Sequence, residues 1–386
     1  MSFDANLASA LKELYFAVNA VWRLGRNMVV AWTYSENVIY LCVVPTYKVF
    51  EIGGDVRQAF SKSRLMEEDD FLEICKVFGA RPTKLVLDVT VGKSSNQFSP
   101  ATIDRVLRRY AVTRTPFRSV MLFDIVGFSK AEPIQQVAQL NSLEYSINGA
   151  DKRLQGLGLD VELARSTVGD GFYVWNRRRG LEADLRTYLA MLFILIDNKR
   201  ARDKGMSGFV PTLRAVISLG SHYSYHQVEG QSPRGFEYIV GDITITLARL
   251  IGKADDHQLI LGDIKRPLDR NTKQLLDTPQ FLARAHGILD HAEGLEFGGE
   301  PVRSIRSFIT GTDLSGGGTN VTKHVIVDKH GFNHFGFNVR VEVALQNGEM
   351  FEVGIKPNAF IEFPEETTQH PIEVTDLAKV QHLFRG

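Results

Sequence analysis

The sequence predicts an α+β fold built on a mixed β-sheet, and three observations lead to this prediction. Between about residues 115 and 310, short apolar runs of strand length alternate with segments of helix length. Two of the runs are separated only by Gly169-Asp170-Gly171, which predicts an antiparallel hairpin. Other neighbouring runs are separated by whole helices, so their strands can pair in either direction. Together these features predict an α/β sandwich in which helices cover a mixed sheet.

The expected elements of this region follow one another closely along the chain. Strands are predicted at residues 119–124, 161–168, 172–175, 212–219, 237–240 and 258–261. Helices are predicted at residues 133–154, 181–199 and 242–253. In the first of these helices, the following apolar residues fall close to one face: Val137, Leu140, Leu143 and Ile147. The second helix is strongly apolar along its length.

The chain is long enough for more than this one region. With 386 residues, it is expected to hold two or three domains. Residues 1–105 are predicted to form an N-terminal α/β region of unknown role, which opens on an amphipathic helix. Apolar runs at residues 38–44 and 85–91 are its expected strands, with an acidic helix between them. Residues 1–105 contain no motif that points to chemistry, so the catalytic or binding region is expected at residues 115–310.

The C-terminal part of the sequence predicts a third region. Gly316-Gly317-Gly318 has no strand before it and no lysine-bearing helix after it, so it predicts a flexible linker and not a phosphate-binding loop. Hydrophobic alternation at residues 337–343 predicts a strand, and Asn347-Gly348 predicts a tight hairpin turn. Residues 319–386 are therefore expected to form a small β-rich domain.

The overall composition excludes several classes of function. The chain carries 45 lysines and arginines against 45 aspartates and glutamates, so it has none of the basic excess typical of a nucleic-acid-coating surface. Its two cysteines, Cys42 and Cys75, have neither metal-type spacing nor a disulfide framework, which fits a reducing cytosol. We find no uncharged apolar stretch of membrane-spanning length and no secretory signal pattern. The sequence therefore predicts a cytoplasmic protein without membrane insertion.

Two short motifs each place a carboxylate beside glycine at the end of an apolar run. The first is Phe123-Asp124-Ile125-Val126-Gly127-Phe128-Ser129, and the second is Val168-Gly169-Asp170-Gly171-Phe172. Carboxylate oxygens are the hard ligands that divalent cations prefer, and glycine allows phosphate oxygens to approach the backbone closely. Each motif alone is more often an ordinary aspartate at a strand end. Their combination predicts a site for two divalent cations and a triphosphate.

A third motif follows downstream and supplies a cation. At residues 238–250, a strand enters a glycine turn and then a helix that carries Arg249 between apolar neighbours. A partly buried arginine needs a partner, and a phosphate group is a suitable bidentate one. On Arg249 alone, an internal salt bridge is the more common explanation.

In this order and at this spacing, the three motifs resemble those of the class III nucleotidyl cyclases, over roughly residues 115–265. The resemblance implies that Asp124, the carbonyl of Ile125 and Asp170 hold two divalent cations, Mn²⁺ or Mg²⁺. It implies that Arg249 stabilises the transition state and that Phe128 contacts the substrate. In that family, the aspartates and the arginine of one site come from different protomers. The chain is therefore expected to form a homodimer with active sites at the interface.

Two positions depart from the family pattern. Ile245 stands where the family usually has an asparagine that orients the ribose. The late lysine that contacts the triphosphate is not evident at residues 289–299, so the basic residue with this role is not identified.

Two further positions bear on the choice of base. The family's base-selecting positions fall on Ser166 and Tyr238, whereas similar adenylate cyclases have Lys and Asp there, and guanylate cyclases have Glu and Cys. A pocket with neutral hydrogen-bonding groups, made smaller by a tyrosine, suits a pyrimidine. The chain thus resembles the pyrimidine cyclases of bacterial Pycsar anti-phage systems. Those cyclases carry a C-terminal sensor-like domain, and residues 319–386 are expected to match it.

The expected activity is therefore conversion of UTP to 3′,5′-cyclic UMP and pyrophosphate. The resemblance implies that this product is an anti-phage signal read by a cyclic-nucleotide-responsive effector. CTP is the next candidate substrate, because Ser166 and Tyr238 do not separate the two pyrimidines. An adenylate cyclase with a divergent base pocket and a catalytically inactive nucleotide sensor are the remaining alternatives.

Overall fold

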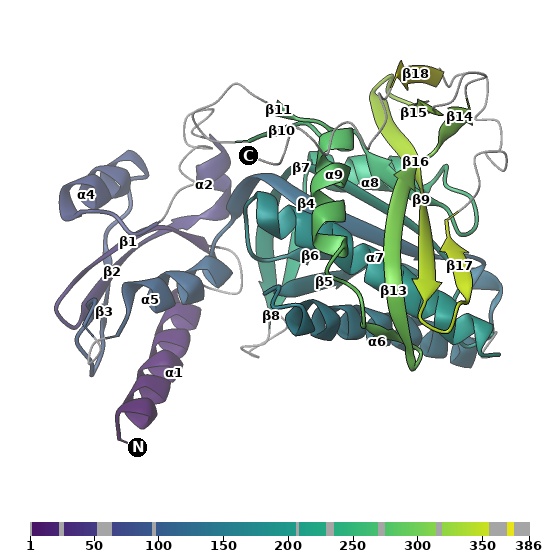
Figure 1. Ribbon diagram of the computed structural model, residues 1–386. Helices are drawn as coiled ribbons and strands as arrows, with labels where there is room; N and C mark the ends of the chain where they lie inside the picture. The colour runs from purple at the N-terminus through teal and green to yellow at the C-terminus, as the bar shows by residue number, and fades with distance from the viewer. Residues whose placement is uncertain are drawn as a thin grey trace. The chain divides into compact units, whose positions relative to one another are not determined.

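The computed structural model describes residues 2–22, 27–51, 64–94, 98–205, 208–228, 235–268, 275–313, 319–354 and 369–373 (Figure 1). The chain divides into two compact units. Unit 1 comprises residues 1–116 and 222–240, and unit 2 comprises residues 117–221 and 241–386. The predicted linker at residues 316–318 lies outside the described residues.

Unit 1 contains a three-stranded antiparallel sheet with helices around it. Its strands are β1 (Asn27–Ser35), β2 (Val38–Pro45) and β3 (Thr83–Val86), in the order β1-β2-β3. Its helices are α1 (Ser2–Trp22), α2 (Thr46–Glu51), α4 (Glu68–Val77), α5 (Pro100–Leu107) and the short 3-10 helix η1 (Arg108–Tyr110). Trp32 is fully buried in its core, and its indole nitrogen donates a hydrogen bond of 3.1 Å to the carboxylate of Asp104. The predicted α/β character of this region is confirmed.

The sheet that carries the predicted motifs has a mixed strand direction. Its main path runs β12-β13-β16-β9-β7-β4-β6-β5. The bounds of these strands are β4 (Thr113–Ile125), β5 (Leu163–Thr167), β6 (Gly171–Asn176), β7 (Leu213–Val228), β9 (Leu259–Gly262), β12 (Glu296–Phe297), β13 (Glu300–Ile309) and β16 (Asn333–Leu345). The β7–β9 pair is parallel, whereas β4–β6 and β5–β6 are antiparallel. The prediction of an α+β fold with a mixed sheet is therefore confirmed.

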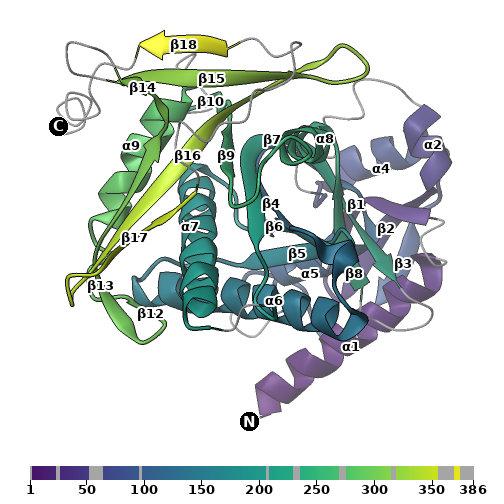
Figure 2. The same cartoon turned by 90° about the vertical axis from the view of Figure 1, so that its right-hand side faces the viewer.

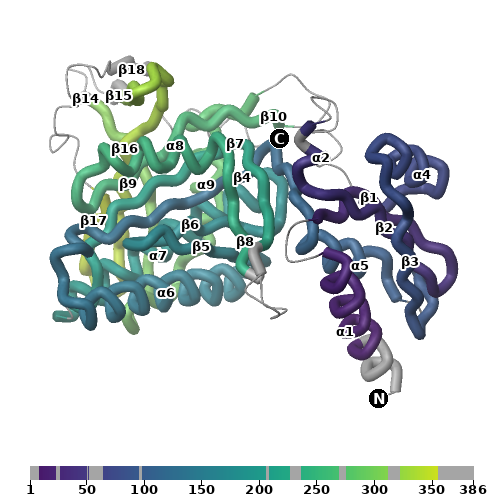
Figure 3. The backbone as a smooth tube through the Cα atoms, turned by 180° about the vertical axis from the view of Figure 1, so that it is seen from behind, coloured from purple at the N-terminus to yellow at the C-terminus, as the bar shows by residue number. Residues whose placement is uncertain are grey.

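Helices cover both faces of the central strands of unit 2. Its helices are η2 (Phe128–Lys130), α6 (Pro133–Gly156), α7 (Leu181–Asp203), α8 (Asp242–Ile251) and α9 (Thr278–Leu289). Figure 2 shows α7 and α8 on opposite sides of β7 and β4, and in the tube view of Figure 3 α6 runs along the same unit below its strands. Phe123 and Ile125 of β4 belong to the same buried cluster as the apolar residues of α7. Asp124, which lies between Phe123 and Ile125 on β4, therefore faces the other side of the sheet.

The described residues after Thr310 are rich in β-strands. Short strands of this part are β14 (Gly311–Asp313), β15 (Thr319–Val327), β17 (Met350–Val353) and β18 (Gln369–Glu373). The long strand β16 pairs with β13 on one side and with β9 on the other. Its alternate residues, including Phe337, Val341 and Leu345, are buried in the same core as Phe123. In the described part of this segment, β16 thus continues the main sheet, and the prediction that residues 319–386 form a domain stays a prediction.

The remaining elements are one short pair of strands and one strand that pairs with β7. β10 (Arg266–Pro267) pairs with β11 (Leu275–Leu276), and β8 (Gly235–Val240) pairs with the second half of β7 within unit 1. Both cysteines are buried and free. No helix among the described residues combines the length and apolarity that a membrane crossing requires.

Candidate active site

Asp124 lies at the end of β4, on the face of the sheet opposite α7. Its neighbours Phe123 and Ile125 are buried in the core, so the alternation of the strand directs the carboxylate to the other face. The side chain is only 13% exposed. A carboxylate this shielded needs a partner.

Asp170 is brought beside Asp124 by the pairing of β4 with β6. Asp124 stands opposite Gly171 in the register, and the backbone amide of Ile125 donates a hydrogen bond of 2.9 Å to the carbonyl of Asp170. Gly171 is required here, because a methyl group at this position would lie 1.9 Å from the carbonyl oxygen of Phe123. The two predicted metal-binding aspartates are thus neighbours, on facing strand ends.

The glycine after β4 has a conformational role. Gly127 has a φ of 69°, in the left-handed region that favours glycine, and it precedes η2. On the β4 side of this turn, the amide of Val126 donates to the carbonyl of Thr212 at 2.9 Å. Phe128 begins η2, and its partly buried ring packs against the core. Its predicted contact with the substrate stays a prediction.

Arg214 is a site residue that the sequence analysis missed. It is the second residue of β7, and its Nε donates a hydrogen bond of 2.6 Å to Oδ2 of Asp124. Its Nη1 donates to the carbonyl of Ala254 at 3.1 Å. The sequence does carry a signal, since Arg214 is a charged residue within an otherwise apolar strand run. A metal ion that binds Asp124 must share this carboxylate with the guanidinium.

The surroundings of Asp124 act on its pKa in opposite directions. Burial raises the pKa, the hydrogen bond and charge of Arg214 lower it, and the negative charge of Asp170 raises it again. The net result is a pKa above the ordinary aspartate value. For a carboxyl group whose pKa is raised by folding, the resulting stabilisation is fully present below the pKa of the unfolded chain. It is lost as the pH rises through the pKa of the folded protein.

Two conservative substitutions should move the pKa of Asp124 in opposite directions. Asp170→Asn removes a nearby negative charge and should lower it, whereas Arg214→Gln removes a positive charge and should raise it. Between the pKa of the unfolded chain and the pKa of the folded protein, the free energy of unfolding falls as the pH rises. This fall should be smaller in Asp170→Asn and larger in Arg214→Gln. Carbon-13 NMR titration of the Asp124 carboxyl group measures both shifts. Shifts of the same sign in the two variants would contradict this assignment.

Helix α8 is fixed on the Asp124 face of the sheet by two contacts. The hydroxyl of Tyr173 on β6 donates a hydrogen bond of 3.2 Å to the carbonyl of Thr244. Ile243 packs against Gly220 of β7 so closely that a methyl group there would lie 3.1 Å from the Ile243 Cβ. Tyr173 is a second positioning residue that the sequence analysis missed, and burial raises the pKa of its hydroxyl.

Arg249, on the last turn of α8, is paired with a carboxylate other than Asp124 and Asp170. Its Nε lies 3.5 Å from Oδ2 of Asp328, and its side chain is 38% exposed. Burial raises the pKa of Asp328, but amide hydrogen bonds from Phe332 and His330, together with the side chain of His334, lower it to about 2. Arg249 is thus paired with a carboxylate that is ionised at neutral pH.

The two predicted base-selecting residues belong to different units. Ser166 lies on β5, opposite Tyr173 of β6, and is half-buried in unit 2. Tyr238 lies on β8 in unit 1, where its ring stacks on that of Tyr225 with the centroids 5.6 Å apart. Their joint role in one pocket therefore stays a prediction.

The oxygen ligands around Asp124 fit divalent cations whose coordination is completed by the phosphates of a substrate. Among the residues that the structure describes, no group of three or more His, Cys, Asp and Glu side chains could hold a metal ion. Asp124 and Asp170 supply two carboxylates on adjacent backbone segments, and the Ile125 carbonyl is a further hard oxygen. Mg²⁺ is commonly held in this way, by one or two carboxylates together with substrate phosphates.

The comparisons with known proteins do not assign the chain to a family. No family model and no curated protein matches the sequence. The chain is similar to the solved structure of the guanylyl cyclase Cya2, with 12% identity and a TM-score of 0.34 over 58% of this chain and 92% of that chain.

Two other solved structures give similar values. The guanylate cyclase domain of RhGC from Catenaria anguillulae, in complex with GTP, has 14% identity and a TM-score of 0.35, over 59% of this chain and 97% of that one. The adenylyl cyclase CyaB from P. aeruginosa has 14% identity and a TM-score of 0.29, over 43% and 93%. TM-scores this low assign neither family nor activity.

Proposed function

We propose that this protein is a class III nucleotidyl cyclase that forms a cyclic mononucleotide and pyrophosphate from a nucleoside triphosphate. The observation that carries the proposal is the pairing of Asp124 with the Asp170 turn, at the ends of facing strands. The order of the three motifs supports it independently. Residues 115–310 are the proposed catalytic region.

In this proposal, Asp124, Asp170 and the Ile125 carbonyl hold two divalent cations, Mn²⁺ or Mg²⁺. When bound, the cations supply Lewis-acid activation of the ribose 3′-hydroxyl and neutralise charge on the departing pyrophosphate. The 3′-oxygen loses its proton to water and bonds to the α-phosphorus, while the bond from that phosphorus to the bridging oxygen breaks and pyrophosphate leaves with the electron pair. Arg214 lowers the pKa of Asp124 and so favours the ionised ligand.

Arg249 is the proposed stabiliser of the negative charge that develops on the phosphorus oxygens. A guanidinium in this role contributes through two parallel hydrogen bonds and a charge that water does not screen. Asp328 is its partner in the single chain, so the proposed role requires Arg249 to leave this 3.5 Å ion pair. In a homodimer, the arginine of one protomer would complete the site of the other.

A mixing experiment tests this shared-site arrangement. Asp124→Asn and Arg249→Ala should each be inactive alone. After equal amounts are mixed and allowed to exchange subunits, about half of the dimers should be mixed, each with one intact site of two. Activity should thus recover to about a quarter of the wild-type value, measured as pyrophosphate release. Activity that stays at the level of the single variants after proven subunit exchange would contradict the arrangement.

For the base, we propose a pyrimidine, with UTP preferred and CTP as the alternative. The neutral side chains of Ser166 and Tyr238 support this choice, because neither supplies the charged group expected of an adenine- or guanine-reading position. By resemblance to Pycsar cyclases, the product would be an anti-phage signal for a cyclic-nucleotide-responsive effector in the cytoplasm. Residues 319–386 would supply the sensor-like part, and the role of residues 1–105 is not assigned.

A further inference from the structure

Asp328 lies in the turn between β15 and β16, and the backbone of this turn fixes its carboxylate. Oδ1 accepts hydrogen bonds from the amides of His330, at 2.8 Å, and Phe332, at 3.0 Å. The amide of Asp328 donates to the carbonyl of Phe332 at 2.9 Å, which closes the turn. Gly331 has a φ of 82°, in the left-handed region that favours glycine. Oδ1 is thus bound within the turn, and Oδ2 is left for partners outside it.

Oδ2 of Asp328 has two such partners, one on α8 and one on β16. The Nε of Arg249 lies 3.5 Å from it, and the Nε2 of His334 lies at the same distance. The side chain of Asp328 is only 3% exposed, so water and salt screen its charge less than they would at the surface. The charge of Arg249 is therefore opposed, in the single chain, by a carboxylate whose position is fixed.

Helix α8 packs closely on β16, which sets the distance between Arg249 and Asp328. A methyl group on Gly336 of β16 would lie 3.3 Å from Cδ2 of Leu250, the residue after Arg249. The same methyl group would lie 2.8 Å from Cγ2 of Ile260 on β9. Because the backbones are packed this tightly, Arg249 leaves Asp328 by turning its own side chain and not by a shift of the helix.

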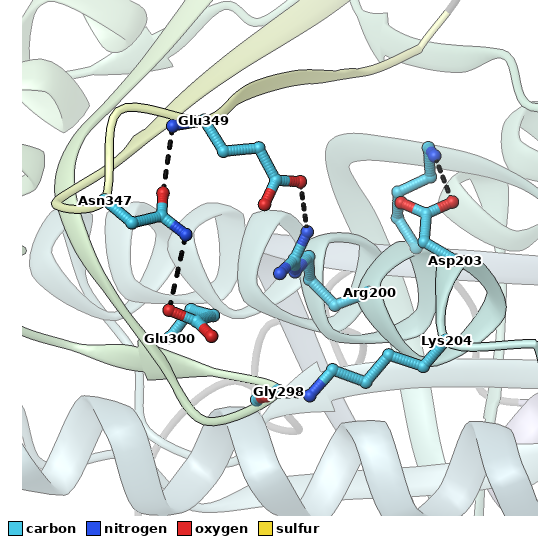
Figure 4. Close-up of polar contacts among 8 residues, drawn as sticks. Arg200, Asp203, Lys204, Gly298, Glu300, Asn347 and Glu349 are labelled. Atoms are coloured by element: carbon cyan, nitrogen blue, oxygen red, sulfur yellow. Dashed lines mark hydrogen bonds and ion pairs between the residues drawn. The ribbon is translucent and has the colours of Figure 1, made fainter.

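The opposite end of β16 is anchored to α7. Figure 4 shows Arg200 of α7 reaching Glu349, in the turn that follows β16, with 2.6 Å between Nη1 and Oε1. In the same turn, the amide of Glu349 donates to Asn347 at 2.9 Å. The guanidinium of Arg200 also lies over the ring of Phe351. With β16 held at this end and paired with β15 at the other, the turn of Asp328 has a fixed place in unit 2.

The ion pair with Asp328 satisfies the guanidinium of Arg249 incompletely. The Nε atom is shielded from water, yet within the part of the chain that the structure describes it donates no hydrogen bond. Its 3.5 Å contact with Oδ2 is an ion pair only. A phosphate group offers two oxygens at hydrogen-bond distance and binds a guanidinium in a bidentate manner. A triphosphate is therefore a strong competitor of Asp328 for Arg249.

Asp328 keeps other partners when Arg249 leaves. The two amides on Oδ1 and the imidazole of His334 remain in place. A buried carboxylate that lost every partner would be strongly destabilised, but this one is not stripped of them. The ion pair can thus open and re-form without disrupting the turn.

We infer that the Asp328–Arg249 ion pair is autoinhibitory: it holds the arginine back until a nucleoside triphosphate, bound at the metal site of the partner protomer, competes for it. This inference rests on the proposed function, because it concerns the arginine assigned there to the transition state. The held fraction of Arg249 lowers the apparent affinity for the competing phosphate in proportion. Loss of the Asp328 charge should therefore activate the enzyme.

Asp328→Asn tests the inference. Asparagine has nearly the same size, and its oxygen accepts the two amide hydrogen bonds of the turn, so only the charge beside Arg249 is lost. We expect kcat/KM to rise about two- to fivefold, the range of a partly exposed ion pair, measured as pyrophosphate release with Mn²⁺ and UTP, CTP, ATP or GTP. The ratio of variant to wild-type activity should fall toward one at high salt, because salt weakens the ion pair in the wild type.

A control and a second variant separate this effect from damage to the turn. Lys329→Gln changes an exposed charge in the same turn and should leave kcat/KM unchanged. Asp328→Asn should melt within about 2 °C of the wild type. Should it fail to fold, Asp328→Ser also keeps an oxygen that can accept the turn amides and removes the charge, and it should show the same activation.

A stability cycle reads the ion pair without any activity. The losses of melting temperature in Asp328→Asn and Arg249→Gln should sum to more than the loss in the double variant, because either change alone breaks the pair. Additive losses would overturn the inference. So would a folded Asp328→Asn protein with unchanged or lower kcat/KM beside an active wild type, and this result would leave the proposed cyclase intact. Absence of a cyclic product from wild type and variant alike, with every nucleotide, would instead overturn the proposed function and the autoinhibition with it.

Discussion

Asp124→Asn should reduce cyclase activity by at least about a thousandfold while leaving the protein folded. The amide keeps the size of the side chain and still offers an oxygen to Arg214, but it removes the negative charge that would hold a divalent cation. It also removes the repulsion between Asp124 and Asp170, which offsets part of the weakened contact with Arg214. The free energy of unfolding should therefore change by about 1 kcal/mol or less.

The measurement is the initial rate of pyrophosphate release with Mn²⁺, together with a thermal unfolding curve. Asp160→Asn is the matched control, because Asp160 is exposed and pairs only at the surface with Arg178. It should keep wild-type activity. A folded Asp124→Asn protein with more than about a tenth of wild-type activity would remove Asp124 from the proposed metal site.

Gly171→Ala should have the largest effect on stability. Its methyl group would lie 1.9 Å from the Phe123 carbonyl oxygen and 3.2 Å from the Cα of Asp124, and both are backbone atoms that cannot turn away. The β4 and β6 strands must separate, which we expect to cost about 3 kcal/mol or more of unfolding free energy. The same separation would move Asp124 away from the Asp170 turn, so activity should fall even where the protein remains folded.

Denaturant unfolding monitored by circular dichroism measures this loss. Gly287→Ala is the control, because Gly287 lies within α9 and a methyl group there meets nothing within 4 Å. Alanine is the better helix former, so this control should stabilise the protein by about 0.5–1 kcal/mol. Equal stability of the two variants would show that the β4–β6 contact tolerates a side chain.

Much of the local structure around the site follows from the sequence. The apolar run before Asp124 predicts a strand, and the Gly-Asp-Gly turn predicts the β5–β6 hairpin, because both signals depend on neighbouring residues alone. The helix that carries Arg249 was predicted at residues 242–253 and is observed as α8, Asp242–Ile251. Local patterns were therefore enough to place the three motifs on the correct elements.

What the sequence did not reveal depends on contacts between distant residues. Arg214 is 90 residues from Asp124, and Tyr173 is 71 residues from Thr244. These contacts exist because β4, β6 and β7 are neighbours in the sheet, an order that hydrophobic periodicity does not determine. The placement of β16 between β13 and β9 has the same origin.

The central claim is that the two aspartates support cyclisation of a nucleoside triphosphate. The most direct test incubates the purified protein with Mn²⁺ and ATP, GTP, CTP or UTP separately, and identifies the products by mass spectrometry. We expect cyclic UMP, or cyclic CMP if CTP is the substrate, formed only with the metal and lost in Asp124→Asn. Cyclic AMP or cyclic GMP would retain the cyclase but contradict the pyrimidine assignment. The absence of any cyclic nucleotide from all four substrates would contradict the claim itself.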